Sequence, residues 1–270
     1  MLQLEKVSYT YDTGKKALEN ISLSLEKGEK VVLLGNNGAG KSTLFLLLNG
    51  VLTTEEGGLR FKDAPVGHRE KDLLPLRKAV GLVFQDADAQ LLGATVEQEI
   101  SFGPMNLRLP KEAVQTAVDQ AIAAMDLAEM RNRSPQYLSG GEKKRVSIAD
   151  ILAMEPEMIL FDEPTASLDP AHTQLFAENL ADLHQKGLGL LISTHDVGFA
   201  WQWADRAIVL AQGALIADGK IGDIFADNDL LRRACLKKPV LFELAETLFP
   251  GANPNDLPRT TGEFHQLLQR

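Results

Sequence analysis

The sequence predicts an α/β fold with a mostly parallel, buried sheet. Short continuous apolar runs are typical of strands covered on both faces, and four of them occur, at 31–34, 79–84, 158–161 and 188–192. Residues 111–125 carry apolar side chains at helical spacing, which predicts an amphipathic helix. Strands interspersed with such helices favour parallel pairing through helical connections.

The composition is that of an ordinary folded protein, and 270 residues suffice for one large domain or two small ones. The net charge of −9 argues against a nucleic-acid-binding surface, so we expect no nucleic-acid partner. Cys235 is the single cysteine, which excludes a disulfide framework, and we expect it to be a small apolar residue of a tail helix. No apolar run is long enough to cross a bilayer and no signal-peptide pattern is present, so we expect a cytosolic protein.

The first 34 residues contain short apolar runs separated by turns at 12–14 and 27–29, which predict the edge of a small antiparallel sheet. Tyr11 lies just before the first of these turns. Its ring could stack on an adenine, because every base offers a π-face. Strand propensity alone also accounts for a tyrosine on an edge strand.

The stretch 35–43 follows a buried strand, precedes an apolar helix and contains the pattern G-x-x-x-x-G-K-[ST] of a P-loop. Its glycines leave backbone N–H groups free to surround a phosphate at a helix N-terminus. Lys41 would reach the β- and γ-phosphates, and the Ser42 hydroxyl would hold Mg²⁺. The predicted nucleotide-binding residues are Asn37, Gly38, Ala39, Gly40, Lys41, Ser42 and Thr43.

After the P-loop helix, we expect loops at 55–58 and 63–65 around a short strand at 59–61. The next strand, at 79–84, ends in Gln85, which is followed by a polar loop. A glutamine at a strand end is most often only a loop residue. The residues alone leave both interpretations open.

Leu138 precedes the sequence Ser139-Gly140-Gly141-Glu142, in which Ser139 and Glu142 have the spacing of a capping box. A helix is therefore predicted to begin at Ser139. The glycines leave N–H groups uncovered at its N-terminus, a second potential phosphate site. An ordinary capped helix is the alternative.

The apolar run 158–161 is followed directly by Asp162 and Glu163, and the apolar run 188–192 is followed after two residues by His195. In open α/β sheets, ligands bind at the carboxyl ends of the strands. Asp162 is therefore placed to hold Mg²⁺ opposite Ser42, and Glu163 to orient or deprotonate a water that attacks the γ-phosphate. His195 lies at the same predicted edge.

The last part of the chain has a different character. A hairpin is predicted around Gly213, and residues 223–250 have an amphipathic helical pattern interrupted at Pro239. Thr260 and Glu263 predict a capping box for a last short helix. We expect 223–270 to be an interaction or dimer-supporting extension without catalytic residues.

Taken in order, the P-loop, Gln85, the Leu-Ser-Gly-Gly sequence at 138–141, the acidic strand end and His195 resemble an ATP-binding cassette (ABC) ATPase over about residues 1–222. The resemblance implies a P-loop NTPase fold with a RecA-like core, an antiparallel β subdomain, an inserted α-helical subdomain at about 86–155, and the helical extension. It also implies ATP and Mg²⁺ as cofactors.

The same resemblance implies that the site is completed across a dimer. Ser139, Gly140 and Gly141 of one copy would contact the γ-phosphate of ATP held by the P-loop of the other. Gln85 would sense phosphate and metal, Asp169 would communicate across the interface, and His195 would contact the γ-phosphate. Because this chain carries a complete set of motifs, a homodimer could have two competent sites.

The region 84–107, with its Phe-Gly-Pro-x-Asn-Leu run at 102–107, resembles the ATPase subunits of energy-coupling factor (ECF) importers. These importers take up vitamins, cobalt or nickel, and the branch for the two metals is our preferred prediction. The resemblance implies a place at the cytoplasmic face of the membrane, a membrane coupling subunit that docks near Gln90–Gly103, and a membrane substrate-binding subunit. An ordinary surface helix is the alternative for this segment.

Three other functions are considered. One is a vitamin-uptake module with a second, different ATPase. Another is a soluble ABC ATPase that acts on ribosomes or DNA, against which the absence of an internal repeat and of sustained heptads argues. The last is an ABC subunit of an exporter or of an importer fed by a binding protein, against which the region 84–107 argues.

Overall fold

The computed structural model describes residues 1–53, 56–166 and 170–269. The predicted Asp169 contact lies outside them. Within the described residues the strands form two sheets. The larger sheet has six strands in the order β10-β9-β3-β8-β7-β6, where β3 is Lys30–Leu34, β6 is Val80–Val83, β7 is Met158–Asp162, β8 is Gly189–Thr194, β9 is Arg206–Ala211 and β10 is Ala214–Lys220.

All neighbours in the larger sheet are parallel except β9 and β10, which form the predicted hairpin around Gly213. The smaller sheet is antiparallel, with the order β2-β1-β4-β5. Its strands are β1 (Leu2–Thr10), β2 (Lys16–Leu25), β4 (Glu56–Phe61) and β5 (Ala64–Pro65). The predicted α/β fold, with a mixed core sheet and an antiparallel β subdomain, is confirmed.

The central strand β3 shows why the larger sheet needs cover on both faces. Val32 and Leu34 belong to a core shared with α7 (Pro170–Gln185) and α8 (Val197–Trp203), whereas Val31 and Leu33 belong to a core shared with α1 (Lys41–Leu48) and the smaller sheet. Successive side chains of a strand point to opposite faces, so a continuous apolar run requires two apolar layers.

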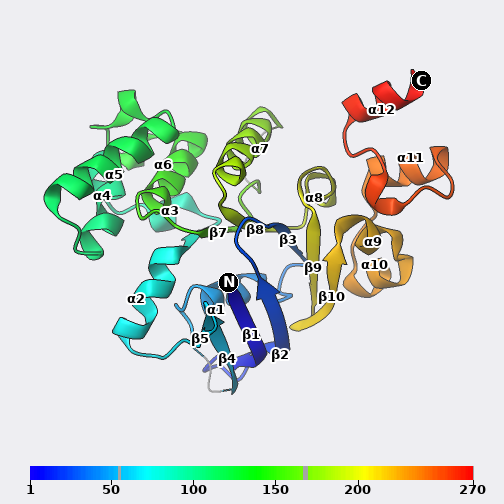
Figure 1. Cartoon of the computed structure of the whole chain (residues 1–270), viewed down its shortest axis with the longest axis horizontal. Helices are drawn as coiled ribbons and strands as arrows, with labels where there is room; N and C mark the ends of the chain where they lie inside the picture. Colours follow the sequence, from blue (N-terminus) through cyan, green and yellow to red (C-terminus); the bar gives the residue numbers. More distant parts are fainter. Residues whose placement is uncertain (54–55, 167–169, 270) are drawn as a thin grey trace.

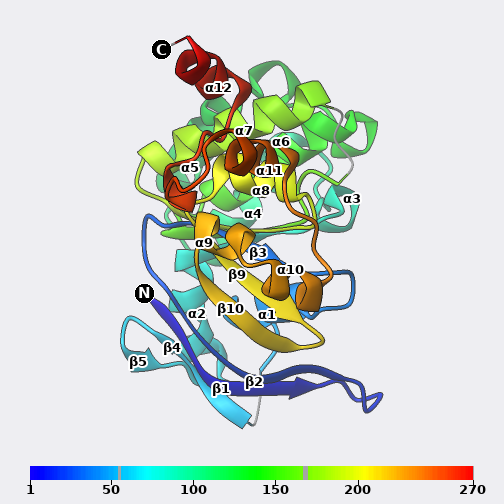
Figure 2. The same ribbon diagram turned by 90° about the vertical axis from the view of Figure 1, so that its right-hand side faces the viewer.

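Figure 1 shows the helices that follow β6 beyond one edge of the larger sheet and the C-terminal helices beyond its other edge, and both groups contribute to the same apolar core. The first group consists of α3 (Ala87–Gln90), α4 (Val96–Asn106), α5 (Lys111–Ala124) and α6 (Gly140–Leu152). The second group consists of α9 (Ile221–Ala226), α10 (Asn228–Ala234), α11 (Val240–Leu248) and α12 (Thr261–Leu268). Figure 2 shows that α12 lies far from the smaller sheet.

The described residues contain no helix that is both long and apolar enough to span a membrane. The predicted division of the chain at residue 222 falls inside α9. Helix α9 continues directly from β10 and packs on it. The division into a cassette and an extension stays a prediction.

Several local predictions are wrong. Residues 56–58 are not a loop but the first residues of β4. Gly57 has φ 80° next to an irregularity in the pairing with β1. A Cβ at this position would lie 2.4 Å from the Glu5 carbonyl oxygen, so the strand needs glycine there. Residues 64–65 form β5. Cys235 is exposed and is the left-handed C-cap of α10, not a small apolar residue packed within a helix.

Two further local differences concern helices. The sequence does not predict α2 (Glu70–Ala79), since Pro75 lies inside it and proline usually interrupts a helix. Thr260 caps α12 as predicted, but the Glu263 carboxylate accepts from the N–H of Arg259 and not from that of Thr260. The second half of that capping box is therefore displaced by one residue.

Candidate active site

The predicted site residues gather at one edge of the larger sheet because its strands are parallel. Gly35 follows β3, Gln85 follows β6, Glu163 follows β7 and His195 follows β8. A cavity of about 390 Å³ opens at this edge. It is lined by Tyr11, Lys15, Ala17, Asn36, Asn37, Gly38, Gly40, Lys41, Ser42, Thr43, Gln85 and Glu163.

The P-loop turns into α1 at Gly40, which has φ 106° and is the N-cap of the helix. A Cβ at this position would lie 2.7 Å from the Ala17 carbonyl oxygen and 2.7 Å from the Leu18 side chain. Glycine is required here on both grounds. No side chain caps α1, so its N-terminal N–H groups are left for a ligand.

Lys41 is only 6% exposed, and its ammonium is held within the P-loop. Nζ donates to the carbonyl oxygen of Gly35 at 2.7 Å and lies 3.1 Å from Glu163 Oε1. The contact with Glu163 is an ion pair without hydrogen-bond geometry, since Oε1 is buried and has no hydrogen-bond partner among the described residues. A phosphate in the loop would compete for this ammonium.

Glu163 is held in a strained backbone conformation, with φ 42°. Its N–H donates to Ser193 Oγ at 2.9 Å, and the Ser193 hydroxyl donates to Asp162 Oδ1 at 2.6 Å. Ser193 lies on β8 and is fully buried. A single hydroxyl therefore fixes both acidic residues at the end of β7.

The Glu163 carboxylate has a nitrogen on each side. Oε2 is 2.8 Å from His195 Nδ1, while Oε1 faces Lys41. The His195 side chain is 62% exposed, so it reaches the carboxylate from the solvent side. A carboxylate held in this way against a phosphate-binding loop can orient a water or accept its proton.

Tyr11 lines the cavity, where its hydroxyl lies 2.9 Å from Thr43 Oγ1. Its ring meets the Tyr9 ring edge to face, at 5.0 Å between centroids. This contact leaves the phenol at the mouth of the P-loop. Adenine stacking on Tyr11 stays a prediction.

Oxygen donors of three kinds make up the predicted magnesium site: hydroxyl, amide and carboxylate. Ser42 and Gln85 line the cavity, whereas Asp162 lies beside it and is 8% exposed. No cluster of three His, Cys, Asp or Glu side chains suited to a metal occurs in the part of the chain that the structure describes. A sparse set of hard donors fits Mg²⁺, which keeps waters and binds through substrate phosphates.

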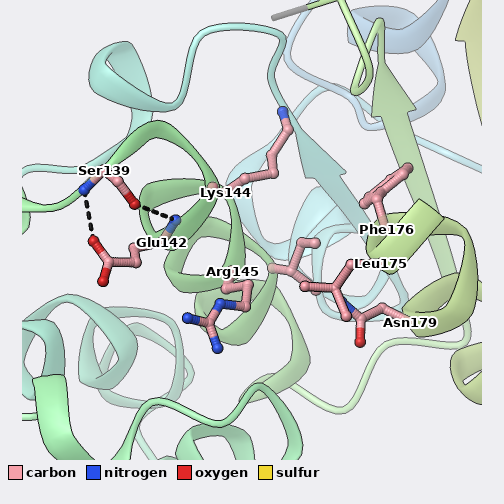
Figure 3. Close-up of a pocket in the computed structure, with 9 residues that line it drawn as sticks. Ser139, Glu142, Lys144, Arg145, Leu175, Phe176 and Asn179 are labelled. Carbon is pink, nitrogen blue, oxygen red and sulfur yellow. Dashed lines mark hydrogen bonds between the residues drawn. The ribbon is translucent and has the colours of Figure 1, made fainter. Parts of the chain in front are cut away.

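The Ser-Gly-Gly sequence lies outside the cavity. Ser139 is the N-cap of α6, where its Oγ accepts from Glu142 N at 3.4 Å and its N–H donates to Glu142 Oε2 at 2.7 Å (Figure 3). The hydrogen bond from the Ser139 backbone lowers the pKa of Glu142. Ser139 and Gly141 line a separate hollow of about 210 Å³ between α6 and α7. Within one chain, Ser139, Gly140 and Gly141 do not reach the P-loop cavity.

Comparison with known proteins decides the family. A family model for ABC transporters matches residues 18–166. The chain belongs to the ABC transporter family. It is 42% identical over 269 residues to an ECF transporter ATP-binding protein of Methanothermobacter thermautotrophicus, which covers 99% of this chain and 86% of that protein. It is also 42% identical over 263 residues to a cobalt import ATP-binding protein of Rhodobacter capsulatus, covering 96% and 94%.

A solved structure agrees with this assignment. The chain superposes on cbiO1 of Clostridium perfringens, described as part of the ABC transporter complex cbiONQ, with a TM-score of 0.76 and 36% identity. The match covers 86% of this chain and 92% of that structure. The predictions of an ABC ATPase of the ECF type and of ATP hydrolysis coupled to transport are confirmed.

This ABC ATPase also has a groove of about 720 Å³ between α2, the end of α4 and α6. Exposed apolar side chains line it, among them Leu74, Phe84 and Met105. Gly103, the end of the predicted docking segment, lies on its wall. Leu92 and Phe102 of the same segment are also exposed.

Sequence reasoning missed four residues of the site: Lys15, Ala17, Asn36 and Ser193. Lys15 stands four positions after Tyr11 in the same hairpin, so the tyrosine could have drawn attention to it. Asn36 lies within the P-loop itself. Ala17 and Ser193 carry no sequence signal. Ala17 belongs to the site because its carbonyl oxygen lies close to Gly40, and Ser193 because its hydroxyl binds the acidic pair at the end of β7.

Proposed function

We propose that this chain hydrolyses Mg-ATP at two sites formed between two copies of itself, and so drives uptake of cobalt or nickel through membrane subunits. One observation carries the proposal. The Glu163 carboxylate is fixed between Lys41 and His195 inside the P-loop cavity, whereas the capped Ser139–Gly141 sequence lies outside it. Each copy thus has one half of a phosphate site to offer to the other.

Within one copy, the residues have distinct tasks. Lys41 would leave Glu163 for the β- and γ-phosphates, and the freed carboxylate would orient a water and accept its proton. His195 would contact the γ-phosphate from the solvent side. Ser42, Gln85 and Asp162 would hold Mg²⁺, which supplies charge neutralisation on the phosphates.

Closure of the dimer would bring Ser139, Gly140 and Gly141 of the partner copy onto the γ-phosphate. Their backbone N–H groups stabilise developing negative charge only while the two copies are together. ATP would then favour the closed dimer, and hydrolysis would release it.

The membrane coupling subunit would dock near Gln90–Gly103, with an apolar helix in the groove beside Gly103. The support is the exposed apolar lining, since contiguous exposed apolar surface marks an interaction site. A membrane substrate-binding subunit would complete the complex. The ATPase would then sit peripherally at the cytoplasmic face of the membrane.

The relatives point to two candidate classes of substrate, metal ions and vitamins. The cobalt import relative favours a metal importer, whereas another relative, 43% identical over 271 residues, is an ECF ATP-binding protein EcfA2 of Methanospirillum hungatei. The second name favours an ATPase that works with a different ATPase, as in a vitamin module.

A tagged pull-down from detergent-solubilised native membranes tests these alternatives. We expect one coupling subunit, one substrate-binding membrane protein and no second ATPase. An equal amount of a different ATPase would contradict the homodimer. The variant Met105→Asp should lose the membrane partners, whereas Leu268→Asp, an exposed apolar residue of α12, should retain them.

A further inference from the structure

Lys144 is a buried cation that the reaction described above does not use. It lies on α6, is 6% exposed and donates from Nζ to the carbonyl oxygens of Phe84 at 2.8 Å and Gln85 at 3.4 Å. Burial lowers the pKa of Lys144 to about 8, against the opposing charges of Asp162 and Asp86. An ammonium is costly to bury, and an apolar side chain of similar length would fit without that cost.

The two carbonyl groups that Lys144 binds belong to the segment that carries Gln85 to the nucleotide cavity. Gln90 ties the other end of this segment to the same helix. Its Oε1 accepts from Phe84 N at 3.2 Å, and its Nε2 donates to the Ser147 carbonyl oxygen at 3.2 Å. The segment 84–90 is therefore attached to α6 by Lys144 at the end next to Gln85, by the exposed ion pair of Lys143 with Asp88, and by Gln90.

Helix α6 also carries Ser139, Gly140 and Gly141 at its N-terminus. Figure 3 shows the Lys144 side chain directed away from Arg145 and from the capping box. Helix α6 therefore contacts, through Lys144, the backbone of Gln85, a residue that lines the P-loop cavity of the same copy. The N-terminus of α6, at Ser139 and Gly140, is exposed. A rigid helix with two such ends can transmit a displacement from one to the other.

We propose that Lys144 is a positioning residue that ties Gln85 to α6, so that each nucleotide site responds to the helix that acts on the other site. The inference rests on the proposed function, because it requires that the α6 N-terminus contacts the partner's nucleotide. It assigns to Lys144 no contact with the nucleotide itself.

The test uses ATP-dependent dimerisation, which needs no hydrolysis. In the full-length Glu163→Gln variant, ATP and Mg²⁺ should give a dimer that light scattering detects. Adding Lys144→Met should raise the ATP concentration needed for dimerisation about tenfold, the scale of other supporting residues behind a ligand set. Binding of a fluorescent ATP analogue to the monomer should change less than threefold, since Lys144 does not line the P-loop cavity.

Lys143→Met is the matched control. Lys143 is the preceding residue of α6 and also meets the segment 84–90, but through an ion pair with the exposed side chain of Asp88 and not through the backbone carbonyl groups at Gln85. An exposed ion pair contributes little. Lys143→Met should therefore dimerise as the parent does. Lys144→Arg keeps a charged donor and should recover at least half of the lost dimerisation. In the protein that retains Glu163 and hydrolyses ATP, Lys144→Met should lower kcat about tenfold with little change in KM.

Two outcomes would overturn the inference. One is unaltered dimerisation and kcat in Lys144→Met. The other is a loss that Lys143→Met shares or that comes with a lower melting temperature and no recovery by Lys144→Arg, which indicates only a structural role. If Lys144→Met does not fold, Lys144→Gln is judged by the same criteria. Failure of Glu163→Gln alone to dimerise would instead refute the proposed function, and the inference with it.

Discussion

The N-termini of α1 and α6 are both glycine-rich, yet they are built in opposite ways. Helix α1 begins after Gly40 with no side-chain cap, and its first N–H groups face a cavity of the same chain. Helix α6 begins after Ser139, which forms a complete capping box with Glu142 and faces outward. An uncapped end requires an external acceptor, whereas a capped end is stable by itself.

The difference indicates a division of tasks. The uncapped end of α1 suits a phosphate ligand, and the Lys41 ammonium beside it contacts Gly35 and Glu163. The end of α6 is stabilised within its own chain by the capping box of Ser139 and Glu142. A helix end that is already capped loses little conformational entropy on docking, which would suit the proposed contact with a second copy.

The largest expected effect concerns the α1 side of this comparison. Glu163→Gln should bind ATP but lower kcat about 10²- to 10⁴-fold, because the general base is lost while the P-loop is intact. Steady-state ATPase assays measure kcat, and a nucleotide-binding assay measures the affinity for ATP. Glu157→Gln, at the opposite end of β7 in an ion pair with Lys62, is the control with normal turnover. Normal ATPase in Glu163→Gln would remove Glu163 from the base role.

Lys41→Ala should weaken ATP binding by about 10²-fold, since it removes the buried cation that meets the phosphates. It should also lower the melting temperature of the nucleotide-free protein, because Glu163 would keep a buried charge without Lys41. The double variant with Glu163→Gln should recover part of that stability. Calorimetry measures both effects, and ATP affinity equal to that of the parent would refute the P-loop assignment.

Ser139→Ala tests the α6 side. It removes the cap, at about 1 kcal/mol of stability, and should lower kcat about tenfold by disordering the N–H groups that the partner's phosphate would meet. Thr260→Ala removes the corresponding cap of α12 and should cost similar stability with unchanged kcat. Equal kcat values for the two variants would show that the α6 end has no part in turnover.

The smallest expected effect concerns the stability contributed by a buried carboxyl group on α6. Asp150 lies on α6, and burial, together with the charge of Glu99, raises its pKa to about 7, against a hydrogen bond from Gln90. Because the folded protein holds this proton more tightly than the unfolded chain, its stability should fall as the pH rises from about 4 through 7. Asp150→Asn should remove this loss.

The melting temperature of Asp150→Asn should therefore exceed that of the parent at pH 8, by about 2–4 °C for each 1 kcal/mol by which the substitution raises the free energy of unfolding. This difference in melting temperature should become smaller as the pH is lowered. Asp119→Asn, on the exposed side of α5, is the control, since its hydrogen bond with Arg131 lowers its pKa. A gap that does not change with pH would contradict the assignment to Asp150.

Most of the site could be predicted from the sequence. The P-loop, the acidic end of β7 and His195 each follow an apolar run, and parallel strands bring such ends to one edge. The failures were local. Pro75 concealed α2, and Gly57 suggested a loop where the pairing of β4 with β1 requires a positive φ. The Gly57 conformation depends on β1, which is distant in the sequence.

The sequence by itself determined the buried strands, the polar residues at their carboxyl ends and the capped start of α6, because strand burial, the P-loop turn and the capping box are encoded within a few residues. Only the tertiary structure decided that Ser193 fixes both acidic residues, that Glu163 lies between Lys41 and His195, and that Lys144 holds the segment of Gln85. These contacts join residues 30 to 122 positions apart, for example Ser193 with Glu163 and Lys41 with Glu163. Local propensity cannot encode such distant pairs, since chain topology brings them together.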